Sequence, residues 1–177
     1  MRPIAQNDTL RRVDRRRFIG WVTAGVVAGG VGIGLVRSSG YHVKADVARK
    51  LQTLSPWHYV VIEAFGVRVL APEQADVAGF ADGFMVGLAA DDRHDLLRFV
   101  AYLEHIAPLA AGHVSRFSGL GPVQQDDVLR SLEQSNVDLL RAGFQALEAL
   151  SMMAYYKQPA SWKAIGYDGP VVDRGKP

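Results

Sequence analysis

The sequence predicts an all-α protein: a single bundle of about five helices, with an N-terminal signal or anchor helix and an irregular, aromatic C-terminal arm. Apolar residues recur at helical spacing through most of residues 46–157. Prolines and glycines separate these periodic stretches into segments of helical length with short connections. Hydrophobic residues make up 49% of the chain, which is enough for a core. We therefore expect a signal segment and linker in 1–45, a helical domain in 46–157 and the arm in 158–177.

The first expected helix follows Ser55, a candidate N-cap, and Pro56, which suits the first helical position. The β-branched residues of 67–70 leave a strand there as an alternative, and Pro72 ends the element in either case. Its predicted core face consists of Trp57, Val60, Ala64 and Val67.

Two further helices are expected over 75–89 and from Asp91 or Asp92 to about residue 110. Pro108 is expected to kink the second of them near its end. The predicted core face of the first is Val77, Phe80, Phe84 and Leu88. That of the second is Leu96, Phe99, Leu103, Ile106 and Ala110.

The remaining elements begin with a loop over 115–124, from which Phe117 and Leu120 are expected to enter the core. A fourth helix follows Pro122 and breaks at Ser135 or Asn136. A fifth runs to Tyr156 and then stops before Pro159, after which a short helical turn ends at Gly166. The expected core residues of these last two helices are Leu129, Leu132, Leu140, Phe144, Leu147 and Leu150.

Composition excludes several classes of site. The chain has no cysteine, so disulfides, cysteine-ligated zinc, iron–sulfur clusters, c-type haem attachment and thiol catalysis are excluded. Seven arginines lie in residues 1–37 against two acidic residues, whereas the rest of the chain has more acidic than basic side chains. The basic character therefore belongs to the N-terminus, and we expect no nucleic-acid partner.

No motif for catalysis, cofactor binding or metal binding is present, so we expect no such residues in this chain. The histidines form no metal-ligand spacing, and no G-x-S-x-G elbow occurs. One alternative is a haem with an axial ligand pair such as His105 and Met152. Glu63 and Arg68 interrupt an apolar helix, and either pair with each other or face a partner. Met152 and Met153 are adjacent, so only one of them is expected to face the bundle interior.

The N-terminus resembles a twin-arginine export signal. Arg15 and Arg16 form the pair, and Phe18 opens an uncharged, glycine-rich stretch that runs to Val36. Asp14 and Gly20 depart from the usual motif. Cleavage after Val43-Lys44-Ala45 or near residues 36–38 is one outcome. An uncleaved transmembrane anchor is the other.

The leader and three later segments together resemble the gluconate 2-dehydrogenase subunit 3 family. The segments are "RRRFIG" (15–20), "SPWHYVVIEAFGVRVLAPE" (55–73), "RFSGLGPVQQDDVLRSLEQS" (116–135) and "FQALEALSMMAYYKQPASWKAIGYDGP" (144–170). The resemblance implies a non-catalytic small subunit in a periplasmic complex associated with the inner membrane. It helps a flavoprotein to fold and escorts it through the twin-arginine translocase.

The resemblance also implies the partners. The large subunit would be an FAD-dependent dehydrogenase of the glucose–methanol–choline (GMC) class, acting on a sugar or alcohol. A multihaem cytochrome c would take its electrons, so FAD and c-type haem belong to partner chains. The alternatives are a membrane-tethering subunit with an uncleaved N-terminal helix, and an independent exported cofactor-binding protein.

The C-terminal arm and the helix before it are the expected partner interface, because Tyr, Trp and Met are typical interface anchors. The alternative is that these aromatics close the core of the bundle itself. The predicted interface residues are Tyr155, Tyr156, Trp162, Gly166, Tyr167, Asp168 and Pro170.

Overall fold

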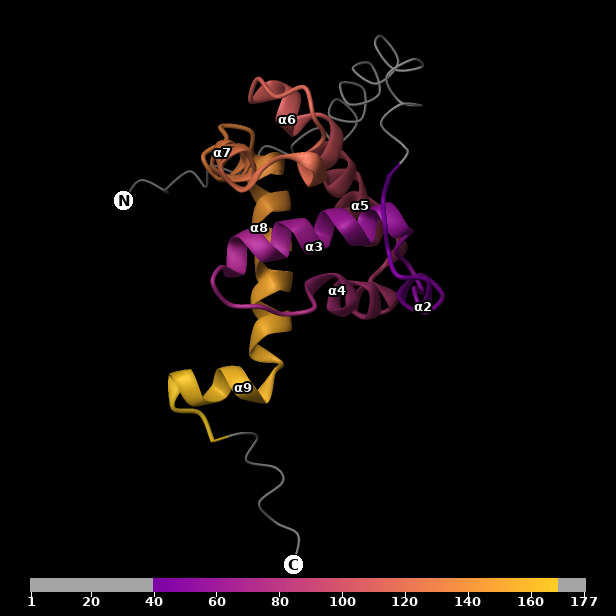
Figure 1. Ribbon diagram of the computed structural model, residues 1–177, viewed down its shortest axis with the longest axis vertical. Coiled ribbons are helices and arrows are strands. Elements are labelled where there is room, and N and C mark those ends of the chain that lie inside the picture. The colour runs from indigo at the N-terminus through magenta and orange to yellow at the C-terminus, as the bar shows by residue number, and fades with distance from the viewer. Residues whose placement is uncertain (1–39, 169–177) are drawn as a thin grey trace, which may run out of the picture. The chain divides into compact units, whose positions relative to one another are not determined.

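The computed structural model describes residues 40–168, which form eight α-helices, α2 to α9, and two 3-10 helices (Figure 1). The five helices of ten or more residues are α3 (Pro56–Leu70), α4 (Val77–Val86), α5 (Ala90–His105), α7 (Pro122–Glu133) and α8 (Asp138–Tyr156). The shorter elements are α2 (Ala45–Ala48), α6 (Ala107–Ala110), η1 (Phe117–Gly119), α9 (Pro159–Trp162) and η2 (Lys163–Ile165).

The all-α prediction is confirmed for residues 40–168, where no strand occurs. The alternative of a strand at 67–70 is wrong, because α3 continues to Leu70. The short helical turn expected after Pro159 is confirmed, because α9 and η2 make the start of the arm helical up to Ile165 and Gly166 ends it. The expected N-terminal signal or anchor helix lies outside the described residues.

Local side-chain caps define where the helices begin and end. Ser55 caps α3 as expected, and its hydroxyl lies 2.8 Å from Nδ1 of His58. Asp76 caps α4, where its Oδ1 accepts a 2.8 Å hydrogen bond from the Gly79 N–H. Gly166 ends η2 with a φ of +67°, in the left-handed region that favours glycine.

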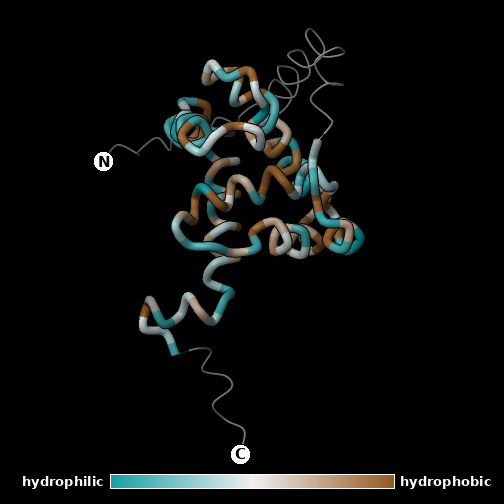
Figure 2. The backbone as a smooth tube through the Cα atoms, in the orientation of Figure 1, coloured by the Kyte–Doolittle hydropathy of each residue, from teal (hydrophilic) through white to brown (hydrophobic). Residues whose placement is uncertain are grey.

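Helix α8 is the centre of the bundle. It crosses α3 and α4 and also contacts α5 and α7 (Figure 1). Phe144 of α8 meets Phe65 of α3 edge to face, with ring centroids 5.7 Å apart. Hydrophobic stretches run along α3 in the middle of the body (Figure 2). All the expected core residues of α7 and α8 are buried: Leu129, Leu132, Leu140, Phe144, Leu147 and Leu150.

The predicted core face of α3 is wrong. Val67 is exposed, and Trp57, Val60 and Ala64 are only half-buried. Helix α3 contacts α4, α5, α7 and α8, so apolar residues lie on most of its sides. In such a helix the period of the apolar residues no longer determines which side is most buried. The buried apolar side chains are instead Val61, Ile62, Phe65 and Leu70.

The predicted face of α4 is correct at Val77 but wrong beyond it, and the helix is shorter than expected. Phe84 is exposed, and Phe80 and Leu88 are half-buried. Small side chains face the core because α4 packs closely on α3. A Cβ placed on Gly66 of α3 would lie 2.5 Å from a methyl group of Val77. The buried apolar residues are Val77, Ala78, Ala81 and Met85.

The third predicted face holds for Phe99 and Leu103 but fails beyond them. Helix α5 ends at His105, and α6 starts again at Ala107 with Pro108 in its first turn. The break changes the direction of the chain, so Ala110 is exposed. The loop over 115–124 behaves as expected, since Phe117 and Leu120 are both buried.

Candidate functional site

The exposed side chains of the C-terminal part of α8 carry no charge, whereas the first turn of the helix carries the ion pair of Asp138 and Arg141 and Glu148 is half-buried. Between residues 142 and 156, the exposed side chains of α8 are Ala142, Gln145, Ala146, Ala149, Met152, Met153 and Tyr156, and we call these seven residues the α8 face. Met152, Met153 and Tyr156 expose 37%, 41% and 46% of their surface. At most one of the two methionines could face the interior, and neither of them does. A helix surface that runs from residue 142 to residue 156 without an exposed charge is unusual in water.

Helix α5 provides the contrast within the same bundle. Its exposed side carries Asp91, Asp92, His94, Asp95 and Arg98. Arg98 forms an exposed ion pair with Asp95 at 3.4 Å. This is the ordinary pattern for a helix side in contact with water. The α8 face departs from that pattern, and such exposed apolar surfaces mark interaction sites.

The arm is held at the end of α8 by its aromatic side chains, in a stretch that also exposes Lys157 and Lys163. Nε1 of Trp162 donates a 2.7 Å hydrogen bond to the backbone carbonyl of Tyr156, so the indole caps the last turn of α8. Tyr167 packs edge to face on Trp162 at 5.4 Å, and its N–H donates to the Trp162 carbonyl. These contacts fix Trp162 half-buried and leave Ile165 and Tyr167 exposed.

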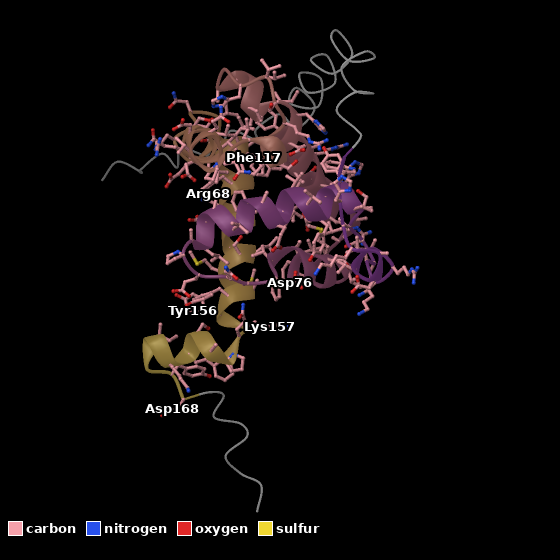
Figure 3. All side chains as sticks on the ribbon, viewed as in Figure 1. Arg68, Asp76, Phe117, Tyr156, Lys157 and Asp168 are labelled. Atoms are coloured by element: carbon pink, nitrogen blue, oxygen red, sulfur yellow. The ribbon has the colours of Figure 1, made fainter. Side chains whose placement is uncertain are left out.

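The structure therefore brings most of the predicted interface residues to one end of the bundle. Tyr155 is half-buried, with its ring 5.2 Å from that of Tyr156. Figure 3 shows Tyr156 and Lys157 on different sides of the last turn of α8. Gly166 and Asp168 are exposed beyond them. Pro170 and the predicted export residues Arg15, Arg16 and Phe18 lie outside the described residues.

An open cleft of about 1080 Å³ adjoins this end of α8. Its walls come from α3, from the 71–76 loop, from the start of α4 and from Ala154 and Lys157. Three carboxylates line it: Glu63, Glu73 and Asp76. The cations of the lining are already engaged. Arg68 forms a double hydrogen bond with Asp126, at 2.8 and 2.7 Å, and the Lys157 ammonium lies 5.4 Å from the centre of the Phe80 ring.

The cleft is electrostatically negative. Burial raises the pKa of Glu63, a 3.4 Å hydrogen bond from the Ala78 N–H opposes the rise, and the Asp76 carboxylate adds to it. Burial and the same two carboxylates raise the pKa of Tyr59 to about 12, and its hydroxyl donates to Asp76. Partial burial and the Glu73 carboxylate raise the pKa of Tyr155. A cation placed in the cleft would oppose the part of each shift that the carboxylates cause.

His58 has a structural role that the sequence analysis missed. Its Nδ1 accepts a long, 3.4 Å hydrogen bond from the Ser55 N–H and lies 2.8 Å from the Ser55 hydroxyl, which is the geometry of a capping box. Burial lowers the pKa of His58 to about 4, so the ring is neutral at pH 7 and Nδ1 is free to accept. The signal in the sequence was a histidine three positions after a serine N-cap.

Within residues 40–168, no group of three or more His, Cys, Asp or Glu side chains is placed to hold a metal ion. No helix in this range is both long and apolar enough to span a bilayer.

Comparison of the chain with protein-family models, with curated proteins and with solved structures found no match in any of the three.

Proposed function

We propose that this chain is the non-catalytic small subunit of a membrane-associated, FAD-dependent GMC-type dehydrogenase that oxidises a sugar or an alcohol. It assists folding of the flavoprotein subunit and escorts it through the twin-arginine pathway to the periplasm. A cytochrome c subunit completes the complex. The observation that supports this role best is the α8 face, whose seven exposed side chains carry no charge and include Met152, Met153 and Tyr156.

The composition of the α8 face fits a protein interface. Met152, Met153 and Tyr156 are residues enriched in the centres of interfaces, and methionine adapts to the shape of its partner. Ala142, Ala146, Ala149 and Met153 recur at the spacing of one helix side, so small side chains leave room for a partner helix to approach. Trp162 holds Tyr167 beside this surface.

The neighbouring cleft supports a partner segment that carries positive charge. Glu63, Glu73 and Asp76 outnumber the two cations of the lining, and of these Arg68 is paired with Asp126 and Lys157 lies over the Phe80 ring. A partner segment that covers the end of α8 reaches this cleft at Ala154 and Lys157. We therefore expect the flavoprotein to present an apolar segment flanked by arginine or lysine side chains.

The proposal is tested by placing a charge in the middle of the α8 face. The tagged full-length chain is produced in its own host, and the flavin bound per captured chain is measured for the wild type and for Ala149→Arg. We expect Ala149→Arg to weaken flavoprotein binding at least about a hundredfold, because a buried, unpaired charge costs several kcal/mol. An unchanged flavin yield would contradict the proposal.

Ala110→Arg is the matched control. Ala110 is an exposed alanine in α6, a helix that does not contribute to the α8 face. The Ala110→Arg variant should therefore keep the flavin yield at the wild-type level. Circular dichroism of both variants checks that the helical content is retained, so that a loss of flavin reports on the interface.

A further inference from the structure

The carboxylate of Glu104 is completely buried on α5 and is fully hydrogen-bonded. The Tyr41 hydroxyl donates to Oε1 at 2.8 Å, and the Ser118 hydroxyl donates to the same oxygen at 2.7 Å. The Ser118 N–H donates to Oε2 at 2.9 Å. One buried charge thus joins α5, the loop around η1 and the chain at Tyr41, which is 63 positions away in sequence.

Arg116 completes this network from the other side. Its Nε lies 3.6 Å from Oε1 of Glu104, and its guanidinium carbon lies 4.1 Å from the centre of the Tyr41 ring. The Trp57 ring lies 6.2 Å from the Tyr41 ring. Tyr41 is therefore held by a hydrogen bond to α5, a cation–π contact from Arg116 and an aromatic contact from α3.

The residues after Tyr41 are folded as well. Helix α2 begins at Ala45, whose carbonyl accepts a hydrogen bond from the Arg49 N–H. Further on, the carboxylate of buried Asp82 accepts hydrogen bonds from three consecutive N–H groups, those of Gln52, Thr53 and Leu54. The segment from Tyr41 to Leu54 is thus fastened to the body at both ends.

We propose that Tyr41, Glu104, Arg116 and Ser118 form a latch that protects the Val43-Lys44-Ala45 site from proteolysis once the domain has folded. Proteases hold their substrates in an extended conformation, whereas Ala45 and Asp46 are the first residues of α2. Cutting there requires α2 to unwind and Tyr41 to leave Glu104, which would lose a hydrogen bond in a buried site. The mature chain therefore keeps Tyr41, and any removal of the leader takes place upstream of it.

The inference rests on the proposed function only in treating residues 1–39 as an export leader. A twin-arginine substrate is already folded when it is processed, so the latch is closed at that time. The chain then follows one of two routes. Either the leader is cut before Gly40, or it stays attached and tethers the complex to the membrane.

The latch is tested on the full chain with trypsin as the probe, because Lys44, Arg49 and Lys50 are cleavage sites inside the protected segment. Mass spectrometry follows the cleavage rate at these three sites. We expect slow cleavage in the wild type and at least about tenfold faster cleavage in Tyr41→Phe, which removes only the latch hydroxyl. Equal rates in the wild type and Tyr41→Phe would overturn the latch.

Glu104→Gln and Asp95→Asn provide the comparison. Both residues lie on α5, but Asp95 is exposed and its carboxylate accepts a hydrogen bond from Arg98. Trypsin should therefore cleave Asp95→Asn at the wild-type rate. Trypsin should cleave Glu104→Gln faster than the wild type. If Glu104→Gln does not fold, Tyr41→Phe still decides the question, because Glu104 keeps Ser118 and Arg116 as partners in that variant.

N-terminal sequencing of the exported protein gives the second measurement. A start at or before Tyr41 supports the latch, and a start at Asp46 overturns it. Failure of the latch proposal and failure of the proposed function give different results. Loss of the latch appears as rapid cleavage at Lys44 while flavin capture persists, whereas failure of the proposed function appears as absent flavin with Lys44 still protected.

Discussion

Asp82→Ala is expected to lower the free energy of unfolding by about 3–5 kcal/mol, since each hydrogen bond to a charged group is worth about 1.5–3 kcal/mol and their contributions are not fully additive. The buried carboxylate accepts hydrogen bonds from the N–H groups of Gln52, Thr53 and Leu54 at 2.7–2.9 Å, and another from the Thr53 hydroxyl at 3.0 Å. Removing it leaves these donors without their acceptor and releases the segment before α3. Urea unfolding followed by circular dichroism measures the loss.

Asp127→Ala is the control for this prediction. Asp127 is an exposed carboxylate that forms one ion pair, with Arg130 at 3.0 Å. Its removal should cost less than about 1 kcal/mol, because exposed ion pairs contribute little. If both alanine variants lose the same small amount of stability, Asp82 does not hold the 52–54 segment in solution.

The pH dependence of stability provides a second readout for Asp82. Burial by itself raises its pKa, but the hydrogen bonds from Leu54, Gln52 and Thr53 outweigh burial and hold the pKa below its ordinary value of 3.8. A carboxyl group with a lowered pKa stabilises the fold above its unfolded pKa, and this contribution is lost as pH falls through the folded pKa. Below about pH 4 the wild type should therefore lose stability more steeply than Asp82→Asn.

Gly143→Ala is expected to destabilise the fold by about 1–3 kcal/mol, although alanine favours helix over glycine by about 1 kcal/mol. Gly143 lies on α8 against the Phe99 ring, and an added Cβ would lie 2.2 Å from Cδ2 of that ring. Phe99 is buried between α5 and α8, so the ring cannot move away freely. Thermal unfolding measures the change.

Gly83→Ala should change the stability of the fold in the opposite direction. Gly83 also lies inside a helix, but an added Cβ there has nothing within 4 Å. The substitution should raise stability by about 0.5–1 kcal/mol through helix propensity alone. Stabilisation by both substitutions would mean that α5 and α8 pack less closely than the contact at Gly143 requires.

The sequence predicted the parts of the fold that depend on local pattern. The core residues of α8, such as Leu140 and Leu147, recur at clean helical spacing on an amphipathic helix, so their burial was predictable. The prediction failed on α3 and α4, where nearly every position is apolar. There, burial is decided by which neighbouring helix comes closest, and a pattern within one helix does not contain that information.

The polar interior was not predicted either. Two signals in the sequence pointed to buried carboxylates. Asp82 is the only charged residue in α4, and Glu104 lies beside the apolar stripe of α5. Their partners, Gln52 to Leu54 and Tyr41, are far away in sequence. The cleft next to α8 combines residues 59–80 with residues 154–159 for the same reason. The aromatic arm was predicted from composition, but the hydrogen bond from Trp162 to the end of α8 was not.

Methionine oxidation tests the central claim, that the α8 face is the docking surface for the flavoprotein, most directly. Met152 and Met153 are exposed on that face, and Met85 is buried in the core and serves as an internal reference. Mild peroxide converts accessible methionine to its sulfoxide, which mass spectrometry detects at each position. The free chain and the complex with its flavoprotein are compared at equal peroxide concentration. We predict that complex formation slows oxidation of Met152 and Met153 several-fold, with Met85 slow in both samples. Unchanged oxidation of Met152 and Met153 in a flavin-containing complex would contradict the claim.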